Sequence, residues 1–327
     1  MSGWKIKRLN DALVGDLMQK PVVLVLVGPT AVGKTETALT LAQELNCEII
    51  SADSMQVYRG MDIGTAKASL EEQSLVKHHL LDIINPDQKF TAADYVRLAE
   101  QCIAEIAARN RFPLVTGGTG LYINALIDGF LFPDQGENRK IRTELQARAE
   151  TEPEALHEEL KQVDPKSAAK LHPNDLRRII RALEVYYTQG MPISELQAKK
   201  EAEQKYRAVM IGLNRNRELL YQRIEARVDQ MIAAGLVDEV KELLTKYPQQ
   251  PTALQAIGYK EIALYLNDQL TLEEAIELIK RETRRYAKRQ LSWFRRDKRI
   301  VWYDMDVTAV PAVVSDTKKR LEQVMQP

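Results

Sequence analysis

The sequence predicts an α/β protein: a parallel sheet covered by helices, interrupted by a helical insertion and followed by C-terminal helices. Two observations support this fold class. Up to about residue 116, short apolar segments alternate with helical patterns, which is typical of parallel strands because each needs a crossover connection. From about 137 to 200 the pattern is helical and highly charged, and strand candidates return only after it.

The clearest local pattern is an apolar segment that runs into a glycine-rich loop. Residues 22–27 are all apolar and mostly β-branched, as expected for a strand buried on both faces. The next segment, GPTAVGKT at 28–35, fits the pattern G-x-x-x-x-G-K-[ST], and a helical pattern follows over 35–42. Backbone amides of such a loop face an anion, Lys34 adds a charge and Thr35 offers a hydroxyl to Mg²⁺. We predict a P-loop NTPase-like core that binds a di- or triphosphate; a simple turn is the alternative.

Further strand and helix candidates complete the outline. Strands are predicted at 48–51, 79–84, 113–116, 207–213 and 299–304, and helices at 91–109 and 218–234. A last helix opens with a capping box at 271–274. The predicted organisation is an N-terminal extension (1–20), the first part of the core (21–136), the helical insertion (137–200) and a completion of the core with basic C-terminal helices (201–327).

Composition excludes several classes of protein. No apolar run is long enough to span a bilayer, and no secretion signal precedes the first strand, so we expect a cytoplasmic protein. The cysteines, Cys47 and Cys102, are expected to be reduced and are too few for a structural zinc site. Because 46 basic residues balance 46 acidic ones, a nucleic-acid partner would have to bind local basic clusters.

Asp53 is the first candidate for chemistry beyond the loop. It follows the second predicted strand, so its carboxylate is expected at the same sheet edge as the phosphate loop. A general base or a metal ligand would lie there, and an Asp that stabilises a turn is the alternative. Asp82 lies within the strand candidate at 79–84 and has a weaker case; the alternative is that it satisfies backbone groups at the strand end.

Arginines on two predicted helices are candidates for anion binding. Asn174 or Asp175 can cap a helix whose apolar stripe lies opposite Arg177, Arg178 and Arg181, a face that suits a polyanion or simply solvent. On the helix at 218–234, Arg223 and Arg227 lie one turn apart. They are suited to clamp a diphosphate, or alternatively to pair with Glu225 and Asp229.

The end of the predicted last helix is strongly basic. Between 281 and 299 nine basic residues face only Glu282 and Asp297, and Tyr286, Trp293 and Phe294 lie among them. This exceeds what a helix C-terminus needs, and it favours binding of an RNA backbone with aromatic support.

Five ordered segments together resemble the tRNA dimethylallyltransferases, also called tRNA isopentenyltransferases, over about 22–303. They are GPTAVGKT (28–35), DSMQVYRGMDIGTAK (53–67), GGTGLY (117–122), HPND (172–175) with RALE (181–184), and QAIGYK (255–260). The similarity is to the bacterial form, since the cysteines needed for the zinc-binding extension of eukaryotic members are absent.

The resemblance implies transfer of a dimethylallyl group from its diphosphate to the exocyclic amine of the adenosine 3′ of the anticodon. It implies that Asp53 accepts the amine proton, that Lys34 and Thr35 act in catalysis, and that Mg²⁺ binds near Thr35. The implied partners are dimethylallyl diphosphate and a tRNA anticodon stem-loop, with no membrane, and we expect a monomer. The predicted diphosphate-binding residues are Gly28, Pro29, Thr30, Ala31, Val32, Gly33, Lys34, Thr35, Arg223 and Arg227. The implied tRNA-binding residues are Asp53, Ser54, Met55, Gln56, Thr119, Arg142, Arg177, Arg178, Ile179, Ile180, Arg181, Gln255, Ala256, Ile257, Gly258, Tyr259 and Lys260.

Three other functions share part of this pattern. An ATP-dependent small-molecule kinase has the same loop and core but no use for several basic surfaces. An adenylate isopentenyltransferase performs the same chemistry on a free nucleotide and does not need the arginine face at 177–181. A non-enzymatic RNA-binding module leaves the phosphate loop without a role.

Overall fold

The structure is a computed structural model that describes residues 20–129, 138–201, 205–249 and 252–326. The chain forms two compact units. One comprises the described residues of Met1–Leu126 and Tyr206–Pro327, and the other is Ile127–Lys205. The helical insertion predicted at 137–200 lies within the second unit; the predicted N-terminal extension at 1–20 lies outside the described residues, except for Lys20.

A six-stranded parallel sheet forms the centre of the first unit, in the order β3-β2-β4-β1-β5-β6. The strands are β1 (Val22–Val27), β2 (Cys47–Ser51), β3 (His78–His79), β4 (Phe112–Gly117), β5 (Arg207–Asn214) and β6 (Val301–Asp304). All residues of β1 are buried, as expected for a central strand covered on both faces. The α/β fold predicted from the sequence is therefore confirmed.

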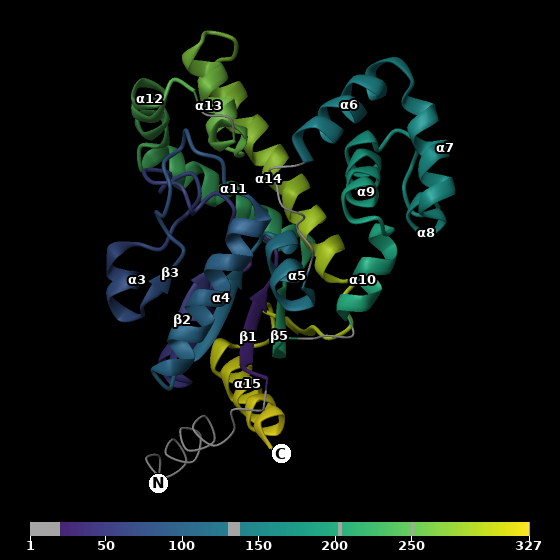
Figure 1. Cartoon of the computed structure of the whole chain (residues 1–327). Helices are drawn as coiled ribbons and strands as arrows, with labels where there is room; N and C mark the ends of the chain where they lie inside the picture. Colours follow the sequence, from purple (N-terminus) through teal and green to yellow (C-terminus); the bar gives the residue numbers. More distant parts are fainter. Residues whose placement is uncertain (1–19, 130–137, 202–204, 250–251, 327) are drawn as a thin grey trace. The chain divides into compact units, whose positions relative to one another are not determined.

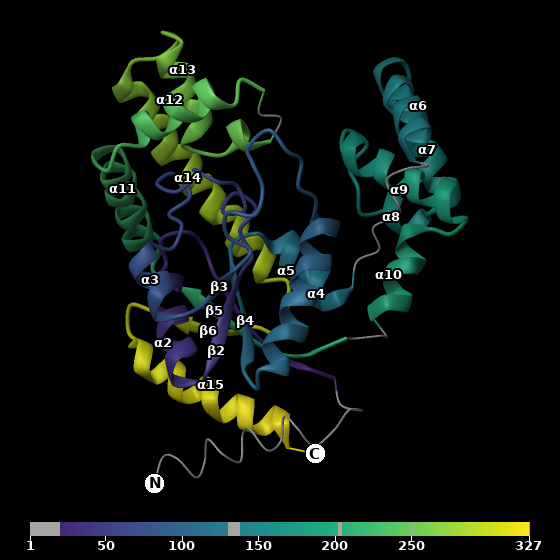
Figure 2. The ribbon, with the colours of Figure 1, turned by 60° about the vertical axis from the view of Figure 1, so that its left-hand side comes forward.

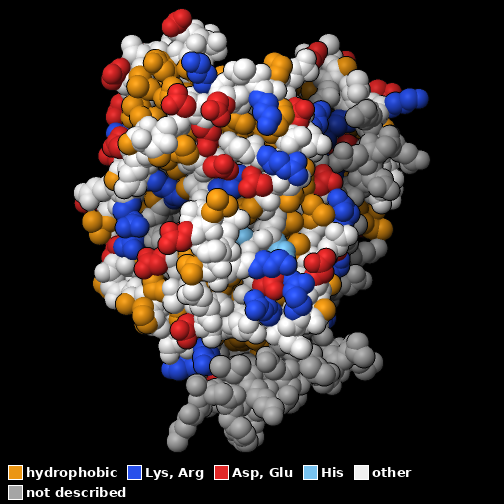
Figure 3. Space-filling model, turned by 90° about the vertical axis from the view of Figure 1, so that its left-hand side faces the viewer, with side chains coloured by type: hydrophobic (Ala, Val, Ile, Leu, Met, Phe, Trp, Pro, Cys, Tyr) orange, Lys and Arg blue, Asp and Glu red, His pale blue; other side chains and the backbone are white. Residues whose placement is uncertain are grey.

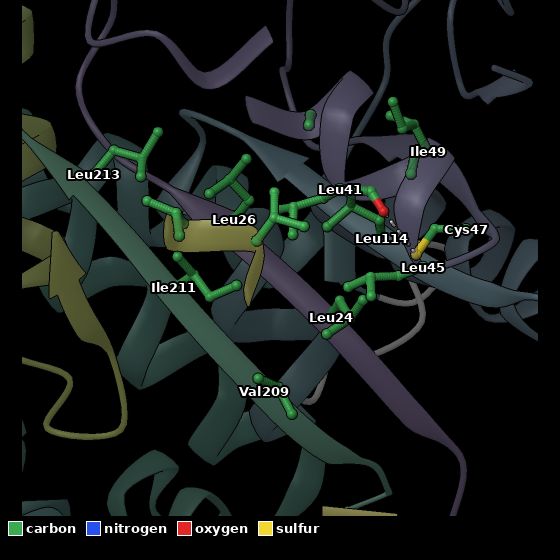
Figure 4. Packing of buried hydrophobic residues seen from close by; sticks show 14 of the residues in the cluster. Leu24, Leu26, Leu41, Leu45, Cys47, Ile49, Leu114, Val209, Ile211 and Leu213 are labelled. Carbon is green, nitrogen blue, oxygen red and sulfur yellow. Dashed lines mark hydrogen bonds between the residues drawn. The ribbon is translucent and has the colours of Figure 1, made fainter. Parts of the chain in front are cut away.

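Helices cover both faces of this sheet (Figures 1 and 2). On one face α2 (Lys34–Glu44) and α15 (Val310–Met325) pack against each other and the strands. Figure 4 shows this core, in which alternate residues of β1 and β5 lie with Leu41 of α2 and with Leu45, which follows that helix. On the other face α4 (Ala92–Ala108) buries one stripe of residues: Tyr95, Ala99, Ile103 and Ile106. α5 (Gly120–Asp128) follows β4 directly.

A second group of helices extends the first unit. It consists of α11 (Arg217–Ala233), α12 (Leu236–Lys246), the 3₁₀ turn η1 (Ala253–Gln255), α13 (Tyr259–Leu266) and α14 (Leu272–Phe294). Their apolar core also contains Val57, Tyr58 and Met61 from the segment that follows β2. The helical layer is thereby packed onto the loop that carries Asp53.

The unit Ile127–Lys205 is helical throughout its described part, with α6 (Asn138–Thr151), α7 (Pro153–Val163), α8 (Pro165–Ala168), α9 (Leu176–Gln189) and α10 (Ile193–Glu201). Leucines of α6 and α7 pack on Ile179, Ile180 and Leu183 of α9. Asp175 occupies the N-cap position of α9 but makes no side-chain cap; its carboxylate accepts a hydrogen bond from Arg178 at 3.0 Å.

Two predicted elements differ in the structure. The strand expected at 79–84 ends at His79, because Leu80 and Asp82 adopt positive φ angles of 63° and 54°, which a strand cannot contain. The short helix α3 (Leu70–Leu75) precedes it. The helix opened by the capping box of Thr271 and Glu274 is not the last one, since α15 follows β6. This helix, α14, ends at Phe294, so the basic residues Arg295, Arg296, Lys298 and Arg299 lie beyond its end.

Other expectations concern the surface and the cysteines. No described helix has both the length and the apolarity needed to cross a bilayer. On the face in Figure 3, acidic and basic side chains are interspersed, consistent with the balanced charge of the chain. Cys47 and Cys102 are free thiols, as predicted.

A buried carboxylate links β2, β3 and α4. Glu48, whose side chain is 3% exposed, accepts hydrogen bonds from Arg109 at 2.8 and 3.0 Å and lies 2.6 Å from Nε2 of His79. Burial works against the charged carboxylate, but the hydrogen bonds from Arg109 and His79 outweigh it and lower the pKa of Glu48 to about 2.

We predict that Glu48 contributes to the acid dependence of stability. Because the pKa of Glu48 is lower in the folded protein than its usual 4.5, the contribution is full above about pH 4.5 and is lost as the pH falls towards 2. Glu48→Gln should lower the free energy of unfolding at neutral pH. It should also make that free energy less dependent on pH between about pH 5 and 2. Urea unfolding measured across this range would test it, and Glu105→Gln, an exposed partner of the same arginine, is the control. Parallel pH profiles for Glu48→Gln and the wild type would contradict the prediction.

Candidate active site

The loop between β1 and α2 has the backbone geometry of an anion cradle. Gly28 and Gly33 have φ angles of 152° and 113°, and Ala31 has a φ of 62°. A Cβ at Gly28 would lie 2.7 Å from the carbonyl oxygen of Leu213, so that position requires glycine. Gly33 is the N-cap of α2 and gives no side-chain cap, which leaves the first amides of the helix open.

Cations hold the carbonyl groups of this loop. The ammonium of Lys34 donates to the carbonyls of Gly28 and Pro29 at 3.0 and 2.8 Å. Arg223 on α11 donates from Nε to the carbonyl of Ala31 at 2.9 Å, and Arg215 donates to that of Val32 at 3.0 Å. Among the described residues, no acceptor binds the amides of Ala31 to Thr35. These amides are therefore available to a phosphate group.

The ends of β2 and β4 meet beside the loop. The Ala52 amide donates to the carbonyl of Thr116 at 2.7 Å, and the Thr119 amide donates to the carbonyl of Ala52 at 3.1 Å. A Cβ at Gly117 would lie 2.3 Å from the Ala52 oxygen, so only glycine permits this approach. The hydroxyl of Thr119 accepts from the Ser54 amide at 3.0 Å, which fixes the segment that begins at Asp53.

Asp53 lies between two cations in a desolvated site. One oxygen of its carboxylate accepts a hydrogen bond from the Met55 amide at 2.9 Å. Burial raises the pKa of Asp53, although Lys34 and Arg227 favour its charged form. Burial, with the repulsion of Arg227, lowers the pKa of Lys34 to about 7. Burial also lowers the pKa of Arg227. A carboxylate with a raised pKa and a half-buried position is suited to accept a proton.

Two cavities in the first unit meet at Asp53. The larger, of about 670 Å³, is lined by Arg223, Arg227 and five residues of the phosphate loop: Thr30, Ala31, Gly33, Lys34 and Thr35. The smaller, of about 330 Å³, is lined by Ser54, Met55, residues 255–258 and Lys260. Their common wall consists of Thr30, Ala31, Asp53, Thr65, Ala66, Arg227 and Tyr286. A ligand in either cavity would therefore lie next to Asp53.

A carboxylate on α12 anchors the outer wall of the smaller cavity. Glu239 accepts hydrogen bonds from the amides of Asp62, Ile63 and Gly64 at 2.8 to 3.2 Å. The hydroxyl of Tyr259 donates to the same carboxylate at 2.5 Å, and its ring lies where a Cβ of Gly64 would be. The anchored segment leads directly to Thr65 and Ala66, which line both cavities.

The chemistry of the larger cavity fits Mg²⁺ bound mainly through a ligand. No group of three or more His, Cys, Asp or Glu side chains in the described parts of the chain could hold a metal by itself. Mg²⁺ typically retains waters and takes one or two protein oxygens together with phosphate oxygens. The hydroxyl of Thr35 lines the cavity, as does Asp53, so these residues fit a diphosphate-bound Mg²⁺.

The structure brings together most of the residues predicted for diphosphate binding. Thr30, Ala31, Gly33, Lys34 and Thr35 line the larger cavity with Arg223 and Arg227. Gly28, Pro29 and Val32 do not line it. The alternative pairing of the arginines with Glu225 and Asp229 is wrong, because Glu225 pairs with Arg284 and Asp229 pairs with Lys280. Asp82 pairs with Lys67 at 2.6 Å, which accounts for its position without a catalytic role.

The predicted arginine face belongs to the other unit. Arg177 and Arg178 of α9 are exposed, and Arg142 and Arg181 converge on the buried carboxylate of Glu184 at 3.7 and 2.8 Å. Ile179 and Ile180 are 0% and 7% exposed and lie in the core of this unit. Both belong to the apolar stripe of the helix, so a tRNA contact at these positions would involve their backbone and not their side chains; the contact itself stays a prediction.

Three functional positions were missed from the sequence. Gln290 and Thr283 of α14 line the cavities, and Glu239 anchors the wall described above. The segment 281–299 was interpreted through its many basic residues, so the neutral residues Thr283 and Gln290 within it were not singled out. Thr283 lies three residues before Tyr286 and Gln290 four residues after it, so helical periodicity places all three on one face. This spacing is the signal from which the sequence could have predicted both positions.

The sequence matches a known protein family and its members over most of the chain. The family model "IPP transferase" matches residues 56–297. The tRNA dimethylallyltransferase of Halothermothrix orenii is 51% identical over 300 residues, which cover 91% of this chain and 92% of that protein. The corresponding enzyme of Symbiobacterium thermophilum is 52% identical over 289 residues, 88% of this chain and 90% of that protein.

Solved structures show the same relationship. The full-length tRNA isopentenylpyrophosphate transferase of Bacillus halodurans has a TM-score of 0.71 at 47% identity and covers 94% of this chain and 98% of its own. A eukaryotic dimethylallyltransferase acting on tRNA has a TM-score of 0.80 at 30% identity, with 93% and 80% covered. Fold and sequence agree: this chain belongs to the family of tRNA dimethylallyltransferases, which are prenyltransferases.

Proposed function

We propose that the protein transfers a dimethylallyl group from dimethylallyl diphosphate to the exocyclic amine of the adenosine 3′ of the anticodon in tRNA. The observation that carries this proposal is the meeting of two cavities at one carboxylate, Asp53. One cavity has the amides and cations for a diphosphate, and the other has room and polar groups for a base. The two reactants thereby approach the carboxylate from different sides.

The phosphate loop stabilises the leaving group. As the allylic C–O bond breaks, negative charge grows on the diphosphate, and the open amides of the loop, Lys34, Arg223 and Arg227 lie around that charge. Mg²⁺ held by the diphosphate and the Thr35 hydroxyl would supply further neutralisation of the leaving group. A diphosphate beside Lys34 would favour its charged form, because the attraction of the anion opposes the burial that lowers the pKa of this ammonium.

Asp53 accepts a proton from the nucleophile, the exocyclic amine of adenine. The lone pair of the adenine amine is delocalised into the ring, so the amine needs help to lose a proton as its nitrogen attacks the allylic carbon. The raised pKa of Asp53 makes this carboxylate a better base than an exposed aspartate. Ser54, Met55 and residues 255–258 line the cavity from which the base would reach it, after it has left the anticodon stack at a cost of a few kcal/mol.

Two features support a tRNA substrate over a free nucleotide or a kinase reaction. The relatives that match over most of the chain are named for tRNA, and a neighbouring structure is described as acting on tRNA. The exposed Arg177 and Arg178 of α9 add sites for RNA phosphates, which a small-molecule enzyme does not need. The monomeric state and the cytoplasmic location remain predictions from the sequence.

Labelled dimethylallyl diphosphate tests the proposal directly. The full-length protein with Mg²⁺ is expected to transfer label to an unmodified tRNA anticodon stem-loop and not to adenosine monophosphate. Transfer to the mononucleotide alone would support an adenylate isopentenyltransferase. Hydrolysis of ATP or phosphorylation of a small molecule, without label in either acceptor, would support the kinase alternative.

We predict that Asp53→Asn lowers the turnover number by about 10²- to 10⁴-fold, because an amide keeps the shape but cannot accept the proton. The affinity for tRNA should stay within about twofold, since no ion pair to RNA is lost. Single-turnover transfer and filter binding measure the two quantities. Asp87→Asn, an exposed aspartate, is the control. Turnover of Asp53→Asn at the wild-type rate would exclude Asp53 as the base.

We predict that Arg177→Ala weakens tRNA binding and lowers the slope of log affinity against log salt by about 1, because one phosphate contact is lost. Arg177 is the appropriate test, since Arg181 pairs with buried Glu184 and its removal would perturb the unit itself. Lys166→Ala, an exposed residue of α8, is the matched control. An unchanged salt slope for Arg177→Ala would assign this helical face to solvent.

A further inference from the structure

One neutral side chain links the phosphate loop to the far end of the sequence. Gln290 of α14 is 5% exposed, and its Oε1 accepts a hydrogen bond from the Thr30 amide at 2.9 Å. Its Nε2 donates to the carbonyl of Gly118 at 3.1 Å. Both ends of the amide are thereby used, one on each of the two segments that frame the larger cavity.

The glycine at 118 is explained by this side chain. A Cβ there would lie 2.1 Å from Nε2 and 3.3 Å from Cδ of Gln290, and its next neighbour would be the Tyr286 hydroxyl at 3.8 Å. Gly118 is not among the residues with a positive φ, so its backbone conformation would accept alanine. A side chain at 118 would therefore displace the amide of Gln290 and would not strain the turn.

The contact acts on a peptide group of the loop that no cation binds among the described residues. Lys34, Arg215 and Arg223 bind carbonyl groups, whereas Gln290 takes an amide. The Thr30 amide is thus occupied by the side chain of Gln290, while among the described residues no acceptor binds the next five amides. Fixing Thr30 sets where the loop turns, and hence where those amides meet the anion.

We propose that Gln290 is a positioning residue for the diphosphate: its side-chain amide latches the Thr30 amide to the Gly118 carbonyl and so sets the geometry of the anion cradle. The proposal rests on dimethylallyl diphosphate being the substrate of the larger cavity. It assigns no contact with tRNA to Gln290. It therefore predicts that loss of Gln290 changes the KM for dimethylallyl diphosphate and not the KM for tRNA.

A double-mutant cycle between the two partners tests the latch. Gln290→Ala removes the amide, and Gly118→Ala displaces it through the 2.1 Å clash. Each variant should raise the KM for dimethylallyl diphosphate about tenfold, a typical loss for one or two hydrogen bonds, while the KM for tRNA changes less than about twofold. The double variant should resemble either single variant, because once the amide is gone the added methyl meets no clash. Ser292→Ala, an exposed residue of the same helix, is the matched control.

The outcomes separate this proposal from the proposed function. If the wild type fails to use dimethylallyl diphosphate, the proposed function is wrong. If the wild type is active, the latch is overturned by an unchanged KM for the diphosphate, by effects that multiply in the double variant, or by equal increases in both KM values. Equal increases would mean that Gln290 serves only the general fold. Should Gln290→Ala not fold, Gly118→Ala gives the same comparison with the glutamine present.

Discussion

The outward anchoring of the phosphate-loop carbonyls is the interaction on which the site depends. A loop of consecutive amides binds an anion only if each peptide is turned the same way, and that orientation must be enforced from the carbonyl side. Lys34 does this within the loop, whereas Arg215 and Arg223 do it from segments that follow β5. Arg215 is itself held at 2.7 Å by Asp306, which follows β6. The anion site near the N-terminus is therefore completed by the C-terminal part of the chain.

A second consequence of this arrangement is the charge around Asp53. Cations that bind the loop or line its cavity also surround the carboxylate, yet desolvation outweighs them and keeps its pKa raised. The balance is suited to a base that must be free of a proton when substrate arrives and hold one afterwards. Tight pairing with Lys34 or Arg227 would have the opposite effect, because it would make Asp53 a poor proton acceptor.

The sequence predicted the parts of the fold and site whose signals are local. The strand at 22–27, the loop at 28–35 and the position of Asp53 after β2 each depend on a short contiguous pattern, and all three agree with the structure. The strand at 79–84 was wrong because positive φ angles at Leu80 and Asp82, residues without a glycine signal, redirect the chain onto the Val57 carbonyl. A run of apolar residues cannot report such a turn.

The site residues that the sequence did not predict depend on contacts between distant segments of the chain. Glu239 and Gln290 act on residues that are far away in sequence, and neither lies in a pattern that indicates its partner. Ile179 and Ile180 are a different case: the family resemblance implies tRNA contact along the whole segment, whereas helical periodicity places both side chains inward, where the structure has them. Periodicity correctly predicts the burial of these side chains, whereas the tRNA contact implied by the resemblance stays a prediction.

The position of β1 between β4 and β5 has a consequence for synthesis of the protein. While the chain emerges from the ribosome, β1 can pair with β4 soon after β4 is made, but its other edge waits until β5 follows the entire helical unit. During that interval an apolar edge is exposed to other nascent chains, which is a route to aggregation. The interposed unit has its own core, so it can fold during the delay.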